Sequence, residues 1–145
     1  MLDLACGPGR HARYLLSLGH DVTAVDREAQ DIPGARFLRA DLEDGSPWPL
    51  PGASFDGIVV ANYLHRPLFP LIMEALAPGG VLIYETFMRG NERYGKPSNP
   101  AFLLEPGELW RAFGSLHVIA FEQGRDLAPK PAMRQRLCAV RPAKG

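Results

Sequence analysis

The first residues of the chain place a glycine-rich turn between an apolar run and a helix-like segment. The stretch LDLACGPGR puts Gly7 and Gly9 directly after residues 1–5. Glycines at such a turn let the backbone bend tightly and approach a ligand without obstruction by a Cβ atom. Asp26 follows Gly7 by 19 residues and ends the next β-rich segment. A carboxylate at that position can accept hydrogen bonds from both hydroxyls of a ribose, so the spacing predicts a nucleotide-containing ligand.

Two further acids narrow the kind of nucleotide. The pattern Gly7-x-Gly9-x-x-Ala12 also fits a loose dinucleotide fingerprint, which leaves a NAD-dependent oxidoreductase as an alternative. Asp3, however, lies within the first strand, where a carboxylate suits a cationic amino group better than a pyrophosphate. Asp41 ends the third β-rich segment and can accept a hydrogen bond from an exocyclic amine such as adenine N6. An adenosine at one end and an amino acid at the other describe S-adenosylmethionine, which the sequence favours over NAD.

Alternating strands and helices must position these residues. Strands are predicted over 1–5, 21–26, 35–40, 55–61, 81–87, 116–122 and about 134–140, and helices over 9–18, 67–77 and 108–113. The helix after the second strand is nearly absent, and the segments 44–53 and 88–105 are predicted to be irregular. We therefore expect an α/β, doubly wound, mainly parallel sheet in a pared-down form. Ligands of such sheets bind beyond the carboxyl ends of the strands.

Composition restricts the classes of function. The chain has 145 residues with 16 basic and 16 acidic side chains, so it gives no global electrostatic reason to expect nucleic acid. Its two cysteines, Cys6 and Cys138, have no CxxC spacing, which argues against a disulfide framework or a metal site. The chain start does not resemble a signal peptide, and no apolar run approaches the roughly 20 residues of a membrane span. The expected location is cytoplasmic.

The motifs resemble those of class I S-adenosylmethionine-dependent methyltransferases, over essentially the whole chain. LDLACGPGR resembles the glycine-rich first motif, VTAVDRE the second and FLRADLED the third. SFDGIVVANYLHR and LAPGGVLIYETF resemble the fourth and fifth strands with their functional ends. Within the class, the chain is most similar to small bacterial methyltransferases of the tellurite-resistance type.

The resemblance implies a seven-stranded Rossmann-like sheet of order 3-2-1-4-5-7-6 with the last strand antiparallel. It places Asp26 on the ribose, and Asp41 with the Leu42 backbone near adenine. The cofactor-binding residues that it implies are Asp3, Ala5, Cys6, Gly7, Gly9, Asp26, Arg27, Asp41, Leu42 and Asn62.

The chain departs from the family pattern in two ways. Ala5 stands where the first glycine of the motif is usual. Family members also usually carry a few dozen residues before the first motif, which form helices over the methionine end of the cofactor. We therefore expect residues 1–145 to be a single S-adenosylmethionine-binding domain that is short at its N-terminus.

The acceptor side is predicted at the ends of the fourth and fifth strands. Tyr63 could contact the acceptor or the methyl group, and His65 has the pKa of a general base; the alternative is that both cap the following helix and pack. The prolines of the D/N-P-P-Y signature are missing around Asn62, which argues against DNA amino-group methylation. Basic residues in 88–100 could favour an anionic substrate or form a solvated loop. The predicted substrate-binding residues are Arg66, Glu85, Arg89 and Arg93.

The predicted function is therefore methyl transfer by in-line displacement to a small-molecule or other modest-sized acceptor. Such a reaction depends on positioning the acceptor and needs no metal. Nucleic-acid and protein acceptors are left open, as is a homodimer. A non-catalytic S-adenosylmethionine-binding or partner module is the second hypothesis, and the NAD-dependent oxidoreductase is the third.

Overall fold

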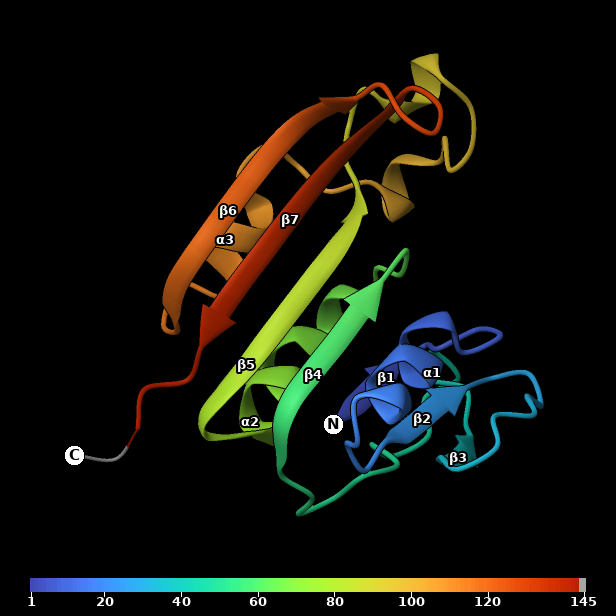
Figure 1. Cartoon of the computed structure of the whole chain (residues 1–145). Coiled ribbons are helices and arrows are strands. Elements are labelled where there is room, and N and C mark those ends of the chain that lie inside the picture. Colours follow the sequence, from blue (N-terminus) through green and yellow to red (C-terminus); the bar gives the residue numbers. More distant parts are fainter. Residues whose placement is uncertain (144–145) are drawn as a thin grey trace.

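The computed structural model describes residues 1–143, whose strands form one seven-stranded sheet in the order β3-β2-β1-β4-β5-β7-β6 (Figure 1). Strands β1 to β5 are parallel, and β7 runs antiparallel to both β5 and β6. The predicted order and the antiparallel last strand are thus confirmed. The strands are β1 (Leu2–Leu4), β2 (Thr23–Asp26), β3 (Arg36–Arg39), β4 (Phe55–Ala61), β5 (Leu76–Phe87), β6 (His117–Asp126) and β7 (Ala132–Val140). The helices are α1 (Arg10–Ser17), α2 (Phe69–Ala75) and α3 (Glu108–Ala112).

Helices cover the two faces of the sheet unequally. α2 and α3 pack on one face, while α1 lies on the other face beside β1 and β2 (Figure 1). Successive residues of β4 point to opposite faces, so Ile58 and Val60 join the core under α2 and α3, whereas Val59 joins the core under α1. This burial on both faces explains why the central strands are nearly continuous apolar runs.

An aromatic cluster anchors the larger core. The ring centroids of Phe69 on α2 and Phe113 after α3 lie 5.0 Å apart, and each lies 5.9 Å from that of Tyr84 on β5. Such tilted and edge-on pairs contribute about 0.5–1.5 kcal/mol each beyond their area burial. The cluster therefore packs α2 and α3 against β5.

The predicted helix over 67–77 is wrong in its bounds. A 3-10 turn occupies Arg66–Leu68, α2 ends at Ala75, and Leu76 already pairs with Phe55 as the first residue of β5. Pro78 disfavours the helical conformation at the residue before it, so the helix ends before the predicted Ala77. The expected strand over 81–87 therefore begins five residues early.

The irregular segments match their prediction, with local detail added. The described residues between β2 and β4 contain the strand β3 and no helix. This is the pared-down form that was expected. Segment 88–105 carries 3-10 turns at Asn91–Arg93 and Pro100–Phe102 and a bridge between Met88 and Leu104. Trp110 is 52% exposed and packs edge-on against Phe121, because short α3 buries Leu109 instead.

Within residues 1–143, no helix is long and apolar enough to cross a membrane. The same residues hold no cluster of three or more side chains with metal-ligand chemistry.

Candidate functional site

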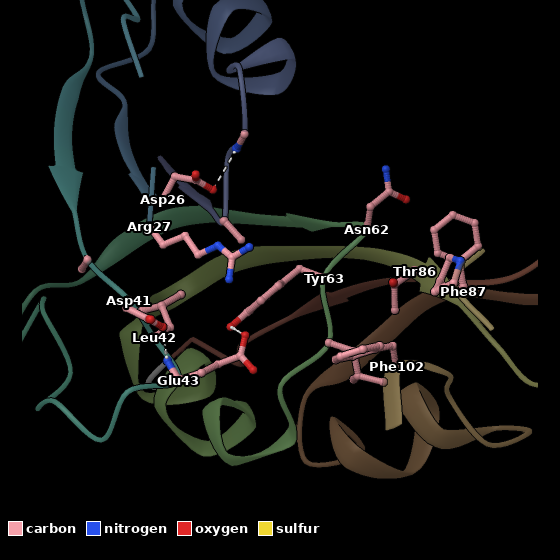
Figure 2. A pocket seen from close by; sticks show the side chains of 15 residues that line it. Asp26, Arg27, Asp41, Leu42, Glu43, Asn62, Tyr63, Thr86, Phe87 and Phe102 are labelled. Atoms are coloured by element: carbon pink, nitrogen blue, oxygen red, sulfur yellow. Dashed lines mark hydrogen bonds between the residues drawn. The ribbon is translucent and has the colours of Figure 1, made fainter. Parts of the chain in front are cut away.

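A cavity of about 520 Å³ opens at the carboxyl ends of the parallel strands (Figure 2). Its volume suits a small organic ligand. One wall, the β2–β3 side, consists of Ala5, Gly7, Asp26, Arg27 and residues 40–43. The opposite wall, the β5 side, consists of Asn62, Thr86, Phe87, Pro97 and Phe102, with Tyr63 and Leu64 between the two walls.

The glycine-rich turn enters the cavity from the end of β1. Gly7 and Gly9 adopt left-handed φ values of 54° and 89°. A Cβ atom on Gly9 would lie 2.6 Å from Ile32 Cδ1, so only glycine fits there without displacing that side chain. The Cys6 amide donates to the Val25 carbonyl at 2.9 Å, which fastens the turn to β2.

Asp26 ties the end of β2 to this turn. Its Oδ1 accepts a hydrogen bond from the Gly7 amide at 3.2 Å, and its Oδ2 accepts one from the Glu28 amide at 3.1 Å. A carboxylate offers about four lone-pair positions, so Asp26 retains acceptor capacity on the cavity wall that it lines. Figure 2 shows Asp26 and Arg27 together on this wall.

A second acidic group stands after β3. Asp41 Oδ1 accepts a hydrogen bond from the Glu43 amide at 2.9 Å, and Tyr63 donates its hydroxyl to Glu43 Oε2 at 3.1 Å across the cavity (Figure 2). Burial and the neighbouring Glu43 carboxylate raise the pKa of Tyr63 above its ordinary value. Sequence reasoning missed Glu43, although it lies two residues after Asp41 in the FLRADLED motif.

Three residues predicted to bind cofactor lie behind the cavity wall rather than on it. Asp3 is buried, and its Oδ2 accepts a hydrogen bond from the Ala12 amide at 3.0 Å, which fixes the first turn of α1. Desolvation raises the pKa of Asp3. Cys6 turns its Sγ toward the Gly7 carbonyl, and burial raises the pKa of the thiol to about 12. Gly9 is buried as well, so these three shape the turn.

Asn62 begins the β5 side at the end of β4. Its φ of 56° is left-handed, its amide donates to the Glu85 carbonyl at 2.8 Å, and its Oδ1 accepts from Arg134 Nη1 at 2.9 Å. The Arg134 guanidinium also lies 4.1 Å from the centroid of the Phe87 ring. Arg134 of β7 therefore holds the ends of β4 and β5 in place on this wall.

The predicted catalytic pair is divided by the structure. Tyr63 lines the cavity, whereas His65 does not. His65 Nδ1 lies 3.5 Å from Glu43 Oε1, and the residue begins the 3-10 turn before α2 without a side-chain cap hydrogen bond. Neither side chain caps the following helix with a hydrogen bond, and Tyr63 packs against the core while it lines the cavity.

The four predicted substrate-binding residues lie outside the main cavity. Arg66 donates to Glu108 at 2.6 and 2.9 Å and to the Leu103 carbonyl at 2.9 Å, which joins segment 88–105 to α3. Arg89 forms an exposed ion pair of 3.0 Å with Glu105. The other two are Glu85, which pairs with two β7 arginines, and Arg93, which is exposed.

Four more residues of the β5 side had no role assigned from the sequence. Thr86 and Phe87 end β5, where the carboxyl-end rule ranks residues 85–87 as candidates, although only Glu85 was assigned to the substrate. Pro97 and Phe102 come from segment 88–105, which has no hydrophobic periodicity to indicate which of its side chains turn inward.

The chain is similar to known proteins in sequence and in fold. The family model described as "Methyltransferase domain" matches residues 2–84. The trans-aconitate 2-methyltransferase of Delftia acidovorans is 34% identical over 97 residues, covering 57% of this chain and 35% of the relative. The malonyl-[acyl-carrier protein] O-methyltransferase of Pseudescherichia vulneris is 31% identical over 142 residues, covering 88% of this chain and 51% of the relative. The chain thus spans about a third to a half of these relatives.

Two solved structures share the fold. TehB from Haemophilus influenzae superimposes with a TM-score of 0.74 at 16% identity, over 97% of this chain and 57% of TehB. The 1,6-didemethyltoxoflavin-N1-methyltransferase of Burkholderia thailandensis gives a TM-score of 0.68 at 21% identity, over 97% of this chain and 70% of its own. That enzyme was solved with bound 1,6-didemethyltoxoflavin and S-adenosylhomocysteine.

Proposed function

The chain belongs to the methyltransferase domain family, the class I S-adenosylmethionine-dependent methyltransferases, and from this premise we propose that it methylates a small-molecule acceptor. The observation that carries the proposal is the β2–β3 side of the cavity. There Asp26, Asp41 and the backbone of the glycine-rich turn line one wall. The acceptor capacity of two carboxylates beside an open glycine turn fits an adenosine with its ribose.

In this proposal the residues of the β2–β3 side hold the nucleoside. Asp26 accepts hydrogen bonds from the ribose hydroxyls, and Asp41 with the Leu42 backbone lies beside the adenine. Ala5, Gly7 and Arg27 complete this wall, and Asn62 lies toward the amino-acid end of the cofactor. Asp3, Cys6 and Gly9 act as positioning residues, because they shape the turn from behind.

S-adenosylmethionine supplies a sulfonium methyl group, an electrophilic carbon whose leaving group is a neutral thioether. The residues of this chain then need to orient an acceptor in line with that carbon and to exclude water. Tyr63, Thr86, Phe87 and Phe102 offer the surface for this on the β5 side. A general base is required only when the acceptor atom carries a proton with a high pKa, and His65 has no part in the proposal.

The printed names of the relatives support a small or carrier-bound acceptor. One group acts on trans-aconitate and another on a malonyl group carried by acyl-carrier protein. A third structural neighbour is in a complex with the activator Trm112. A homodimer and the cytoplasmic location stay predictions for this chain.

Isothermal titration of the chain with S-adenosylmethionine, S-adenosylhomocysteine and NAD tests the proposal. We expect both sulfur nucleotides to bind with micromolar Kd and NAD to give no heat of binding. Binding of NAD without binding of S-adenosylhomocysteine would contradict the proposal and favour an oxidoreductase. Binding of the sulfur nucleotides without methylation of any acceptor in a screen would favour the non-catalytic module.

A further inference from the structure

A second cavity of about 290 Å³ adjoins the main one. The two cavities share Asn62 and Phe87 as lining residues, so the second opens beside the β5 side. Seven of its fifteen lining residues are charged. Five are cationic and two are acidic: Arg10, Lys96, Lys130, Arg134, Arg136, Glu85 and Asp126.

Two of the cations are neutralised within the protein. Arg134 lies 3.2 Å from Glu85 Oε1, and Arg136 lies 3.2 Å from Glu85 Oε2. Arg136 also pairs with Asp126 and, at 3.3 Å, with Glu122. Three carboxylates on β5 and β6 therefore face the two arginines of β7, so this network adds no net positive charge to the second cavity.

The other three cations differ, because no carboxylate among residues 1–143 lies within ion-pair distance of Arg10, Lys96 or Lys130. They come from three separate segments: the start of α1, segment 88–105 and the turn between β6 and β7. All three line the same cavity. Cations that converge on a concave surface attract and orient an anion, because the low-dielectric walls focus their field.

From this arrangement we propose that the second cavity, which we call the cationic cavity, binds the carboxylate groups of the methyl acceptor. The acceptor is then a small organic molecule with two or more carboxylates, placed beside the boundary at Asn62 and Phe87. This inference rests on the proposed function, since it names the substrate class of the same reaction. A carboxylate is deprotonated at neutral pH, so transfer of a methyl group to its oxygen needs no general base.

Binding of citrate, a tricarboxylate probe, tests the proposal. Citrate is titrated into the chain saturated with S-adenosylhomocysteine, at constant ionic strength, and neutral trimethyl citrate is the matched control ligand. We expect citrate to bind and the triester not to bind. In the double variant Lys96→Gln, Lys130→Gln the Kd for citrate should rise about 25-fold, about fivefold for each cation lost.

Arg125→Gln is the matched control variant. It removes one positive charge from β6, and Arg125 lines neither cavity. We expect it to change the Kd for citrate less than twofold. Absence of citrate binding, equal binding of the triester, or equal loss in the Arg125 variant would each overturn the proposal.

A separate titration distinguishes the acceptor from the cofactor as the source of the carboxylate. S-adenosylhomocysteine carries a carboxylate, whereas 5′-methylthioadenosine does not. We expect the double variant to bind both nucleosides as the unaltered chain does. If it binds only S-adenosylhomocysteine more weakly, the cations hold the cofactor and the acceptor assignment is overturned. Failure of S-adenosylhomocysteine to bind the unaltered chain would contradict the proposed function itself.

Discussion

The two walls of the main cavity are held together in different ways. On the β2–β3 side, short-range hydrogen bonds from backbone amides fix the carboxylates. The Glu43 amide donates to Asp41 two residues earlier, and the Glu28 amide donates to Asp26. On the β5 side, the contacts join distant segments through side chains. Arg134 and Asn62 are 72 residues apart.

This difference separates a wall defined by local motifs from a wall defined by tertiary structure. A local motif carries its geometry with it, because each hydrogen bond closes within a turn or between adjacent strands. A contact between side chains that are distant in sequence forms only when the whole sheet is assembled. We therefore expect substitutions on the two sides to affect ligand binding and stability differently.

The largest effect is expected at the glycine-rich turn. Gly9→Ala should lower the free energy of unfolding by about 2–4 kcal/mol, because the left-handed φ costs about 1–2 kcal/mol and the added methyl overpacks against Ile32. Gly7→Ala is the matched control, since a Cβ there meets no atom within 4 Å. Urea unfolding of both variants measures the difference. Equal losses would show that contact with Ile32 does not matter.

The β5 side is tested at Arg66, the long-range anchor that joins segment 88–105 to α3 through Leu103 and Glu108. Arg66→Ala should lower the free energy of unfolding by about 1–2 kcal/mol, because it leaves the partly buried Glu108 without its partner. Affinity for S-adenosylhomocysteine should change little. Arg89→Ala removes an exposed pair of similar distance and should have almost no effect. A larger loss for the Arg89 variant would contradict the difference between the two pairs.

The same anchor predicts a pH dependence. Burial of Glu108 acts to raise its pKa, but hydrogen bonds from Arg66 and from the Glu105 amide outweigh this and lower the pKa below its ordinary 4.5. A carboxyl whose folded pKa is lowered stabilises the fold above its unfolded pKa, and this contribution is lost as pH falls. The stability difference between the unaltered chain and Glu108→Gln should therefore shrink between pH 7 and pH 3.5. A constant difference in urea unfolding at both values would contradict the ion pair.

The smallest effect is expected where the two sides meet. Tyr63→Phe removes an exposed hydrogen bond to Glu43 while the ring keeps its position, since Tyr84 donates to the backbone carbonyl of residue 63 at 2.8 Å. The Kd for S-adenosylhomocysteine should change less than about threefold. A tenfold loss in calorimetry would mean that the hydroxyl contacts the ligand directly.

The sheet order was predicted through the family resemblance of the motifs and not from any one residue pattern. The ends of β2 and β3 have a local signal, because each apolar run is followed by an acid. β4 was predicted to the residue, because alternation and β-branched residues stop where Asn62 adopts a left-handed backbone.

The β5 side could not be predicted in the same way. Arg66 was predicted to bind substrate because it is a cation near the end of β4. Its partner Glu108 lies 42 residues away in sequence and meets it only in the assembled fold. The position of Phe102 likewise follows from contacts that segment 88–105 makes with Arg66 and with β7. Apolar character alone also does not tell which side of the five-residue helix α3 is buried, and the structure buries Leu109 while Trp110 is exposed.

The role of Asp26 is tested most directly by the affinity of S-adenosylhomocysteine for Asp26→Asn, measured by titration calorimetry. We expect a rise in Kd of about 30-fold or more, because the charged acceptor for the ribose is lost. Asp56→Asn, an exposed position on β4, should bind as the unaltered chain does. Equal affinity in the Asp26 and Asp56 variants, with both folded, would contradict the assignment of the β2–β3 side to the cofactor.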